Sequence, residues 1–97
     1  MVIEWLRFKV PPEKLEAFIL RDEEVWTTGL RNFPGYLGKE IWVDSVENEV
    51  VMLIRWESKD QWKSVPQSTI DELDGQMGDL QIAIAESREY QVPKFLR

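Results

Sequence analysis

Hydrophobic and polar residues alternate with a period of two along several stretches of this chain, which is the pattern of β-strands. Residues 34–57 hold two such stretches, separated by a polar break at residues 44–49. The second stretch is apolar on both faces, with Val50, Met52, Ile54 and Trp56 on one face and Val51 and Leu53 on the other. A strand that is apolar on both sides needs cover on both sides, so we predict that this hairpin organises the fold.

The first third of the chain predicts a strand followed by a long helix. Residues 2–10 alternate, and the prolines at positions 11 and 12 end the strand because proline cannot donate to the ladder. Apolar residues then recur at helical spacing over residues 12–31; they are Leu15, Phe18, Ile19, Val25, Trp26 and Leu30. Asp22 lies on or beside that apolar stripe. We interpret it as an edge position bonded to water, with a functional carboxylate as the alternative.

Two short helical segments and a last strand follow the hairpin. Ser58, with glutamine three residues later, forms a capping-box pattern that predicts a helix through Trp62, ended near Val65 by a proline. Ser68 and Asp71 predict the cap of a second short helix. Residues 82–92 predict the last strand, with one face formed by Ile84, Glu86, Arg88, Tyr90 and Val92.

The order strand, helix, strand, strand, helix, strand predicts a single α+β domain over residues 1–97. This is the order of the ferredoxin-like plait, a four-stranded antiparallel sheet whose first and third strands are central. Right-handed crossovers place both helical regions on one face of the sheet. The opposite face, through Ile3, Trp5, Val51 and Leu53 or their alternates, then exposes an apolar patch on the order of several hundred square ångströms. We therefore predict a homodimer in which two sheets pack face to face.

Charge and composition exclude several classes of function. The net charge of −6 argues against a nucleic acid or an anionic membrane as partner, because both bind a basic face. Cysteine and histidine are absent, so the chain has no disulfide, no thiolate or imidazole metal site and no histidine-activated nucleophile. The absence of cysteine fits a reducing compartment, and charged residues at positions 4, 7 and 9 interrupt any signal peptide. We expect a cytoplasmic protein without a bound metal.

Five tryptophans in 97 residues are the most unusual feature of the composition. Trp26, Trp56 and Trp62 could converge at one end of the cleft between sheet and helices and stack on a flat hydrophobic ligand. The alternative is that the tryptophans fill the core or the dimer interface. An empty cleft of roughly 300 Å³ or more would favour ligand binding or catalysis, and a filled cleft would favour an interaction module.

Charged residues inside the predicted strands form the second set of candidates. Glu4 is a candidate general base, with its pKa raised by an apolar pocket, and Arg55 is a candidate holder of an anionic group. The alternative is that these side chains form ion pairs across the strands or across the dimer. Nothing in the spacing of the acidic residues picks out a pair of carboxylates for acid–base catalysis.

Two short segments of the sequence resemble segments found in a known superfamily. Phe-Pro-Gly-Tyr at residues 33–36 and Arg-Trp-Glu-Ser-Lys at residues 55–59 look like the dimeric α/β-barrel proteins, whose best-known branch is the antibiotic-biosynthesis-monooxygenase-like proteins. Residues 4–10 and 86–92 resemble more closely a family of small uncharacterised proteins of photosynthetic bacteria. The superfamily resemblance implies a homodimeric barrel with a pocket between sheet and helices. Enzymes of this superfamily often oxidise quinone-like or polycyclic substrates without a metal or flavin, so the resemblance implies no cofactor.

The haem-degrading branch of the superfamily uses an asparagine on the first strand, a tryptophan in the second helical region and a histidine further along that region. This chain has no asparagine before residue 32 and no histidine, and Trp62 stands earlier than the tryptophan of the branch. We therefore do not expect haem degradation. The function we predict is a small cytoplasmic homodimer that binds a hydrophobic aromatic molecule or serves as a regulatory or structural module. The alternative is a cofactor-independent monooxygenase of quinone-like or aromatic substrates.

Overall fold

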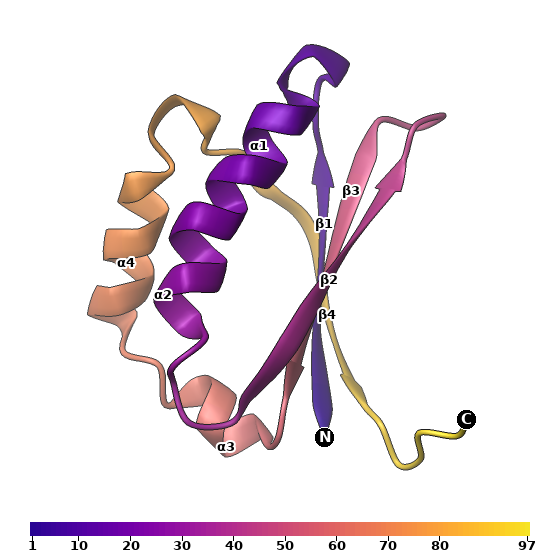
Figure 1. Cartoon of the computed structure of the whole chain (residues 1–97), viewed down its shortest axis with the longest axis vertical. Coiled ribbons are helices and arrows are strands. Elements are labelled where there is room, and N and C mark those ends of the chain that lie inside the picture. The colour runs from indigo at the N-terminus through magenta and orange to yellow at the C-terminus, as the bar shows by residue number, and fades with distance from the viewer.

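Four strands form one antiparallel sheet in the computed structural model, which describes every residue of the chain. They are β1 (Val2–Lys9), β2 (Tyr36–Asp44), β3 (Glu49–Trp56) and β4 (Ile84–Gln91), and their order across the sheet is β2-β3-β1-β4. The helical segments all lie on one side of this sheet, and the other side is bare (Figure 1). The predicted α+β ferredoxin-like plait, with the first and third strands as its central pair, is confirmed.

The first helical region extends over nearly the range that the sequence predicts, but it is not uniform. A 3₁₀ turn η1 (Pro12–Lys14) leads into α1 (Leu15–Asp22), which is followed by a π-helical turn η2 (Glu23–Thr27) and by α2 (Thr28–Leu30). The π turn was not predicted, because helical periodicity does not distinguish it from an α-helix over so few residues. It carries Trp26 and Thr27, both of which face the cavity described below.

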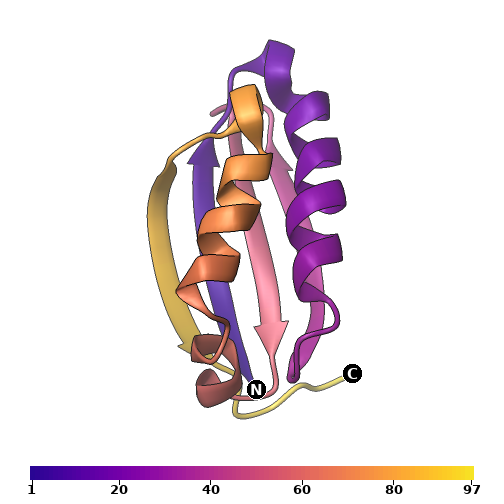
Figure 2. The same cartoon turned by 90° about the vertical axis from the view of Figure 1, so that its left-hand side faces the viewer.

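The second helical region contains α3 (Lys59–Lys63), α4 (Gln67–Gln76) and the 3₁₀ turn η3 (Gly78–Leu80). The predicted cap of α3 is confirmed, since the Ser58 hydroxyl oxygen accepts the Gln61 backbone N–H at 3.2 Å. The predicted Ser68 cap of α4 is wrong: Pro66 occupies the N-cap position with an extended backbone, and Ser68 lies inside the helix. Viewed from the helix side, α1, α2 and α4 pack over the sheet and run roughly along its strands (Figure 2).

Strand β4 contains an irregularity that changes which face its first residue joins. Arg7 pairs with Glu86, but Phe8 pairs with Ile84, so Ala85 is an extra residue in the strand. A bulge of this kind shifts the alternation of side chains by one. Ile84 therefore lies on the same face as Phe8 and contributes to the cavity wall. The prediction that Ile84 shares a face with Glu86 is wrong for this reason.

The two faces of the sheet differ in what covers them. Val50, Met52, Ile54 and Trp56 share one face, as the alternation of β3 predicts, and the structure shows that this face lies beneath the helices and forms the main hydrophobic core. We call it the covered face. The opposite face, which carries Trp5, Leu53 and Arg55, has no helix over it, and we call it the open face. No helix of the chain has both the length and the apolar character needed to span a bilayer.

The open face is more polar than the sequence predicts. Its central apolar residues Ile3 and Leu53 are only 6% and 8% exposed, although no helix covers them. Long charged side chains on the same face form cross-strand ion pairs: Arg55 with Glu40 at 2.9 Å and Arg7 with Glu86 at 3.2 Å. The predicted cross-strand ion pairs are thus present for Arg7 and Arg55, whereas Glu4 forms none. Side chains of this length can cover neighbouring apolar surface with their methylene groups.

Candidate functional site

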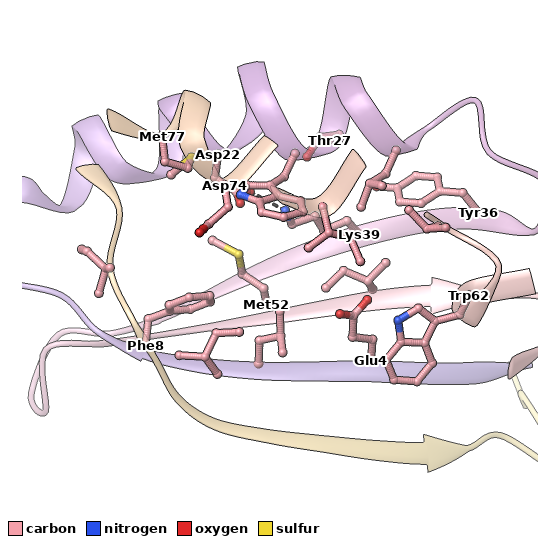
Figure 3. Close-up of a pocket in the computed structure, with 18 of the residues that line it drawn as sticks. Glu4, Phe8, Asp22, Thr27, Tyr36, Lys39, Met52, Trp62, Asp74 and Met77 are labelled. Atoms are coloured by element: carbon pink, nitrogen blue, oxygen red, sulfur yellow. Dashed lines mark hydrogen bonds and ion pairs between the residues drawn. The ribbon is translucent and has the colours of Figure 1, made fainter. Parts of the chain in front are cut away.

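A cavity of about 200 Å³ opens between the covered face and the helices (Figure 3). Fifteen of the 21 residues that line it are hydrophobic. The cleft is thus not filled by side chains, although its volume is smaller than the roughly 300 Å³ at the lower end of ordinary ligand sites. An apolar cavity of about 150 Å³ can hold a benzene molecule, so this one has room for a single ring or a small bicyclic ring system.

Aromatic side chains from both layers of the fold meet in this cavity. Trp26 comes from the π turn, Trp56 from the end of β3 and Trp62 from α3, and all three line the cavity. Tyr36 joins them from the start of β2, with its ring edge-to-face against Trp56 at a centroid distance of 5.5 Å. Trp56 is only 1% exposed and belongs equally to the core. The cavity therefore offers flat apolar surfaces held by a packed core.

Glu4 contributes a carboxylate to the sheet side of the cavity. Its side chain rises from β1 toward the helix layer (Figure 3). Burial raises the pKa of Glu4, and the hydrogen bond from Trp56 offsets part of that increase, as do the positive charges of Lys63 and Lys39. The Trp56 Nε1–H donates to Glu4 Oε1 at 3.2 Å. A carboxyl group with this environment can hold or accept a proton next to an apolar ligand.

A buried ion pair lies on the helix side of the same cavity. The Lys39 ammonium on β2 donates to the Asp22 carboxylate at the end of α1, and their side chains are 8% and 5% exposed. Burial raises the pKa of Asp22, and the contact with Lys39 offsets part of that increase. The interpretation of Asp22 as an edge position bonded to water is therefore wrong. The pair could have been predicted from Lys39, because a charged residue on the helix-facing side of β2 needs a buried partner.

Tyr36 and Thr27 add hydroxyl groups to the lining. Burial is the main cause that raises the pKa of Tyr36, and the negative charges of Asp22 and Glu4 raise it further, whereas a hydrogen bond with Thr27 lowers it. The Tyr36 phenol therefore keeps its proton at neutral pH and can donate it in a hydrogen bond. The π turn explains why Thr27 reaches this position, because it adds a residue to the turn that faces the sheet.

Arg55 does not join the cavity. It follows the alternation of β3, so it points to the open face while its neighbour Trp56 points to the covered face. There its Nη2 donates to Glu40 Oε2 at 2.9 Å. The structure thus groups Glu4 with the three tryptophans and separates Arg55 from them. No group of three or more acidic side chains is placed to hold a metal ion.

Comparisons with known proteins agree on the family and on the fold. The family described as antibiotic biosynthesis monooxygenase matches residues 1–69 of the chain. The haem degrader MhuD from Mycobacterium tuberculosis, solved with two haems bound in its active site, is 21% identical with a TM-score of 0.72, and the match covers 100% of both chains. A mutant of MhuD with two manganese protoporphyrin IX molecules bound per active site is 18% identical with a TM-score of 0.82, covering 100% of this chain and 99% of that one.

A dimeric ferredoxin-like protein from an uncultured marine organism is also similar, at 19% identity and a TM-score of 0.71, covering 99% of this chain and 91% of that one. At these identities the likeness to solved structures shows the fold alone. A comparison with proteins of curated function finds no match. The closer resemblance to small proteins of photosynthetic bacteria stays a prediction.

Proposed function

This chain belongs to the antibiotic biosynthesis monooxygenase family, and from that premise we propose that it binds a hydrophobic aromatic small molecule in the cavity between its sheet and its helices. The observation that carries the proposal is the convergence of Trp26, Trp56 and Trp62 on one open, mostly apolar cavity. Small-molecule sites combine such apolar walls with a few polar groups that fix orientation. Glu4 and Tyr36 are the polar groups available here.

The size of the cavity and the composition of the chain favour a ligand smaller than haem. The MhuD structures show two porphyrins in one active site of this fold. Here the volume of about 200 Å³ suits one or two rings, and the chain contains no histidine to serve as an axial ligand. We therefore propose a mono- or bicyclic ligand and expect no Soret shift when haemin is mixed with the protein.

Quenching of tryptophan fluorescence tests the binding function. A panel of quinones and flavonoids is titrated into the protein, with haemin measured separately by absorbance. At least one small aromatic member is expected to quench the emission with saturation, because three of the five tryptophans line the cavity. A flat response across the whole panel, supported by the absence of heat in calorimetry, would mean that the cavity is only a packing defect of the core.

A second candidate function is cofactor-independent oxygenation of a phenolic ring, and the environment of Glu4 favours it. In this reaction Glu4 accepts the proton of the substrate hydroxyl, and the ring carbon opposite bonds to dioxygen to form a hydroperoxide. Cleavage of the O–O bond with loss of water leaves a quinone, so one phenol and one dioxygen give one quinone and one water. The raised pKa of Glu4 places this group closer to the range that general bases use at neutral pH.

Oxygen uptake in the presence of naphthols tests this second function. Glu4→Gln should lower the turnover rate by about 10²–10⁴-fold, the usual contribution of a positioned base, and one atom of labelled dioxygen should appear in the quinone. Glu40→Gln, which alters a carboxylate on the open face, is the matched control. Equal rates in the wild-type protein and in Glu4→Gln would remove Glu4 from the mechanism.

We also propose that the chain forms a homodimer through its open face. Trp42 on this face is 46% exposed and Tyr90 is 44% exposed, so aromatic surface remains available to a second copy. The dimeric ferredoxin-like neighbour supports the assembly. Sedimentation velocity at micromolar concentration is expected to show a dimer, and a monomer across the whole concentration range would contradict it.

A further inference from the structure

The charges that line the cavity are unbalanced. Lys39 is the only basic residue of the lining, and Asp22 already pairs with it. Asp74 also lines the cavity, and its Oδ2 accepts Gln81 Nε2 at 2.5 Å. Glu4 is the lining carboxylate that takes part in no ion pair and accepts no amide group. The cavity therefore presents one carboxylate that forms no ion pair within the chain, although the positive charges of Lys63 and Lys39 act on it from beyond contact distance.

The hydrogen bonding of Glu4 leaves room for a ligand. Its one side-chain partner is the Trp56 Nε1–H, at 3.2 Å, on the Oε1 atom. A carboxylate can accept about four hydrogen bonds through its two oxygens, so most of the acceptor capacity of Glu4 is unused by side chains. A half-buried negative charge of this kind is costly without a cationic partner. A ligand that brings a cationic donor would supply that partner.

The aromatic walls favour the same kind of ligand. The face of a tryptophan ring attracts an ammonium group, most strongly where water is excluded. Trp62 already shows this behaviour, because the Lys63 Nζ lies 4.0 Å from the centroid of its ring. The other aromatic rings of the wall, Trp26 and Tyr36, would surround a cation held near Glu4.

We propose that the cavity binds a protonated amine attached to an aromatic ring, with the ammonium group at Glu4 and the ring between the tryptophans. The inference rests on the proposed binding function and names the class of ligand. A neutral carbonyl compound that accepts a hydrogen bond from a protonated Glu4 would require the opposite protonation state. The two cases differ in the charge of the best ligand, which can be measured directly.

Calorimetry at pH 7 with three ligands of one shape makes this measurement. The ligands are 2-phenylethylamine, 2-phenylethanol and phenylacetate, which share the ring and carry a positive, a neutral and a negative group. The amine is expected to bind at least tenfold more tightly than the alcohol, and phenylacetate is expected to bind more weakly than either. In Glu4→Gln the affinities of amine and alcohol should lie within twofold of each other. In Glu40→Gln, a control on the open face, the tenfold preference should remain.

An alcohol that binds as tightly as the amine would overturn the inference, and so would an amine preference that survives in Glu4→Gln. The wild-type comparison needs no variant, so it decides the matter even if Glu4→Gln fails to fold. Absence of binding by all three ligands, together with quenching by a quinone or flavonoid, would overturn the inference and leave the binding function intact. Absence of binding by all three ligands and by every quinone and flavonoid of the panel would overturn both.

Discussion

The covered and the open face of the sheet both mix charged with apolar residues, but the charges have different surroundings. On the covered face Lys39 and Asp22 form one pair whose side chains are 8% and 5% exposed. On the open face Arg55 and Glu40 form a pair whose side chains are 29% and 51% exposed. Removal from water makes a lone charge expensive, whereas water compensates an exposed one. The comparison shows that position in the fold decides what an ion pair contributes.

The largest expected difference between the faces lies in the cost of losing one partner of each pair. Lys39→Met should lower the free energy of unfolding by about 3–5 kcal/mol, because it leaves the Asp22 carboxylate buried and unpaired. Arg55→Met should lower it far less, because the Glu40 carboxylate stays in contact with water. Urea unfolding at pH 7 measures both. Similar losses for the two variants would contradict the assignment of one pair as buried.

The double variant Asp22→Leu/Lys39→Met tests whether the loss in Lys39→Met comes from the unpaired Asp22 carboxylate. Replacing both members of a buried pair by apolar residues of similar size is often neutral or stabilising. We expect the double variant to recover most of the stability that Lys39→Met loses. A double variant as unstable as the single one would mean that the pair contributes through its hydrogen bonds and not only through its charge balance.

The next effect concerns self-association and should be confined to the open face. Trp42→Glu places a charge on an exposed aromatic of that face and should weaken the dimer by at least about tenfold, because burying an unpaired carboxylate costs more than about 1 kcal/mol. Sedimentation velocity over a range of concentrations measures the shift. A dimer of unchanged strength would move the interface away from the open face.

Only substitutions on the covered face should change the affinity for the ligand. Trp62→Ala should weaken binding of the best ligand of the aromatic panel by about tenfold, equivalent to 1.4 kcal/mol, because a stacking surface of the cavity is removed. Trp42→Ala on the open face is the matched control and should change the affinity less than twofold. Calorimetry measures both variants, and an equal loss in the two would place the ligand outside the cavity.

The smallest effect is a pH dependence of opposite sign on the two faces. Burial raises the pKa of Glu4 above its ordinary 4.5, so ionising it destabilises the folded state as the pH rises above that value. Glu4→Gln removes this cost and should raise Tm at pH 7 by about 2–4 °C, roughly half a kcal/mol in a domain of this size. Well below pH 4.5 the difference should vanish, because Glu4 is then protonated in both states.

Glu40 on the open face should show a pH dependence of stability with the opposite sign. Its hydrogen bond from Arg55 lowers its pKa below 4.5, so the ionised group stabilises the fold above that value and loses this effect as the pH falls. Glu40→Gln should therefore lower Tm slightly at pH 7 and have no effect once the pH is below the lowered pKa. Thermal unfolding from pH 3 to pH 8 measures both variants. Changes of Tm with the same sign in the two variants at pH 7 would contradict the assignment of Glu4 to the covered face.

Local patterns were sufficient for most of the fold. The alternation in β1 and β3 identifies the central strands and their faces, and the side chain of Ser58 marks the start of α3. Each of these features depends on residues close together in the sequence. The same alternation also implies that Trp56 and Arg55 point to opposite sides of β3, so Arg55 could have been excluded from a cavity that Trp56 lines.

The features that the sequence did not reveal depend on contacts between distant segments. Ala85 becomes a bulge only through the pairing of β4 with Arg7 and Phe8, and β4 itself has polar residues on both faces, so no burial pattern marks the shift. The pairing of Asp22 with Lys39 joins a helix to a strand across the core. The bounds of the π turn depend on how the first helical region packs on the sheet. Four of the five candidate site residues named from the sequence nevertheless line the cavity, namely Glu4, Trp26, Trp56 and Trp62.

The central claim is that the covered face binds the ligand and the open face binds a second copy of the chain. The indole N–H signals of the five tryptophans report on both faces in one NMR spectrum, since Trp26, Trp56 and Trp62 line the cavity and Trp5 and Trp42 lie on the open face. Addition of an aromatic ligand should shift the signals of Trp26, Trp56 and Trp62 and leave those of Trp5 and Trp42 in place. Dilution, which dissociates the dimer, should shift the signals of Trp5 and Trp42 and leave the three cavity signals in place. Ligand-induced shifts confined to Trp5 and Trp42 would contradict the account.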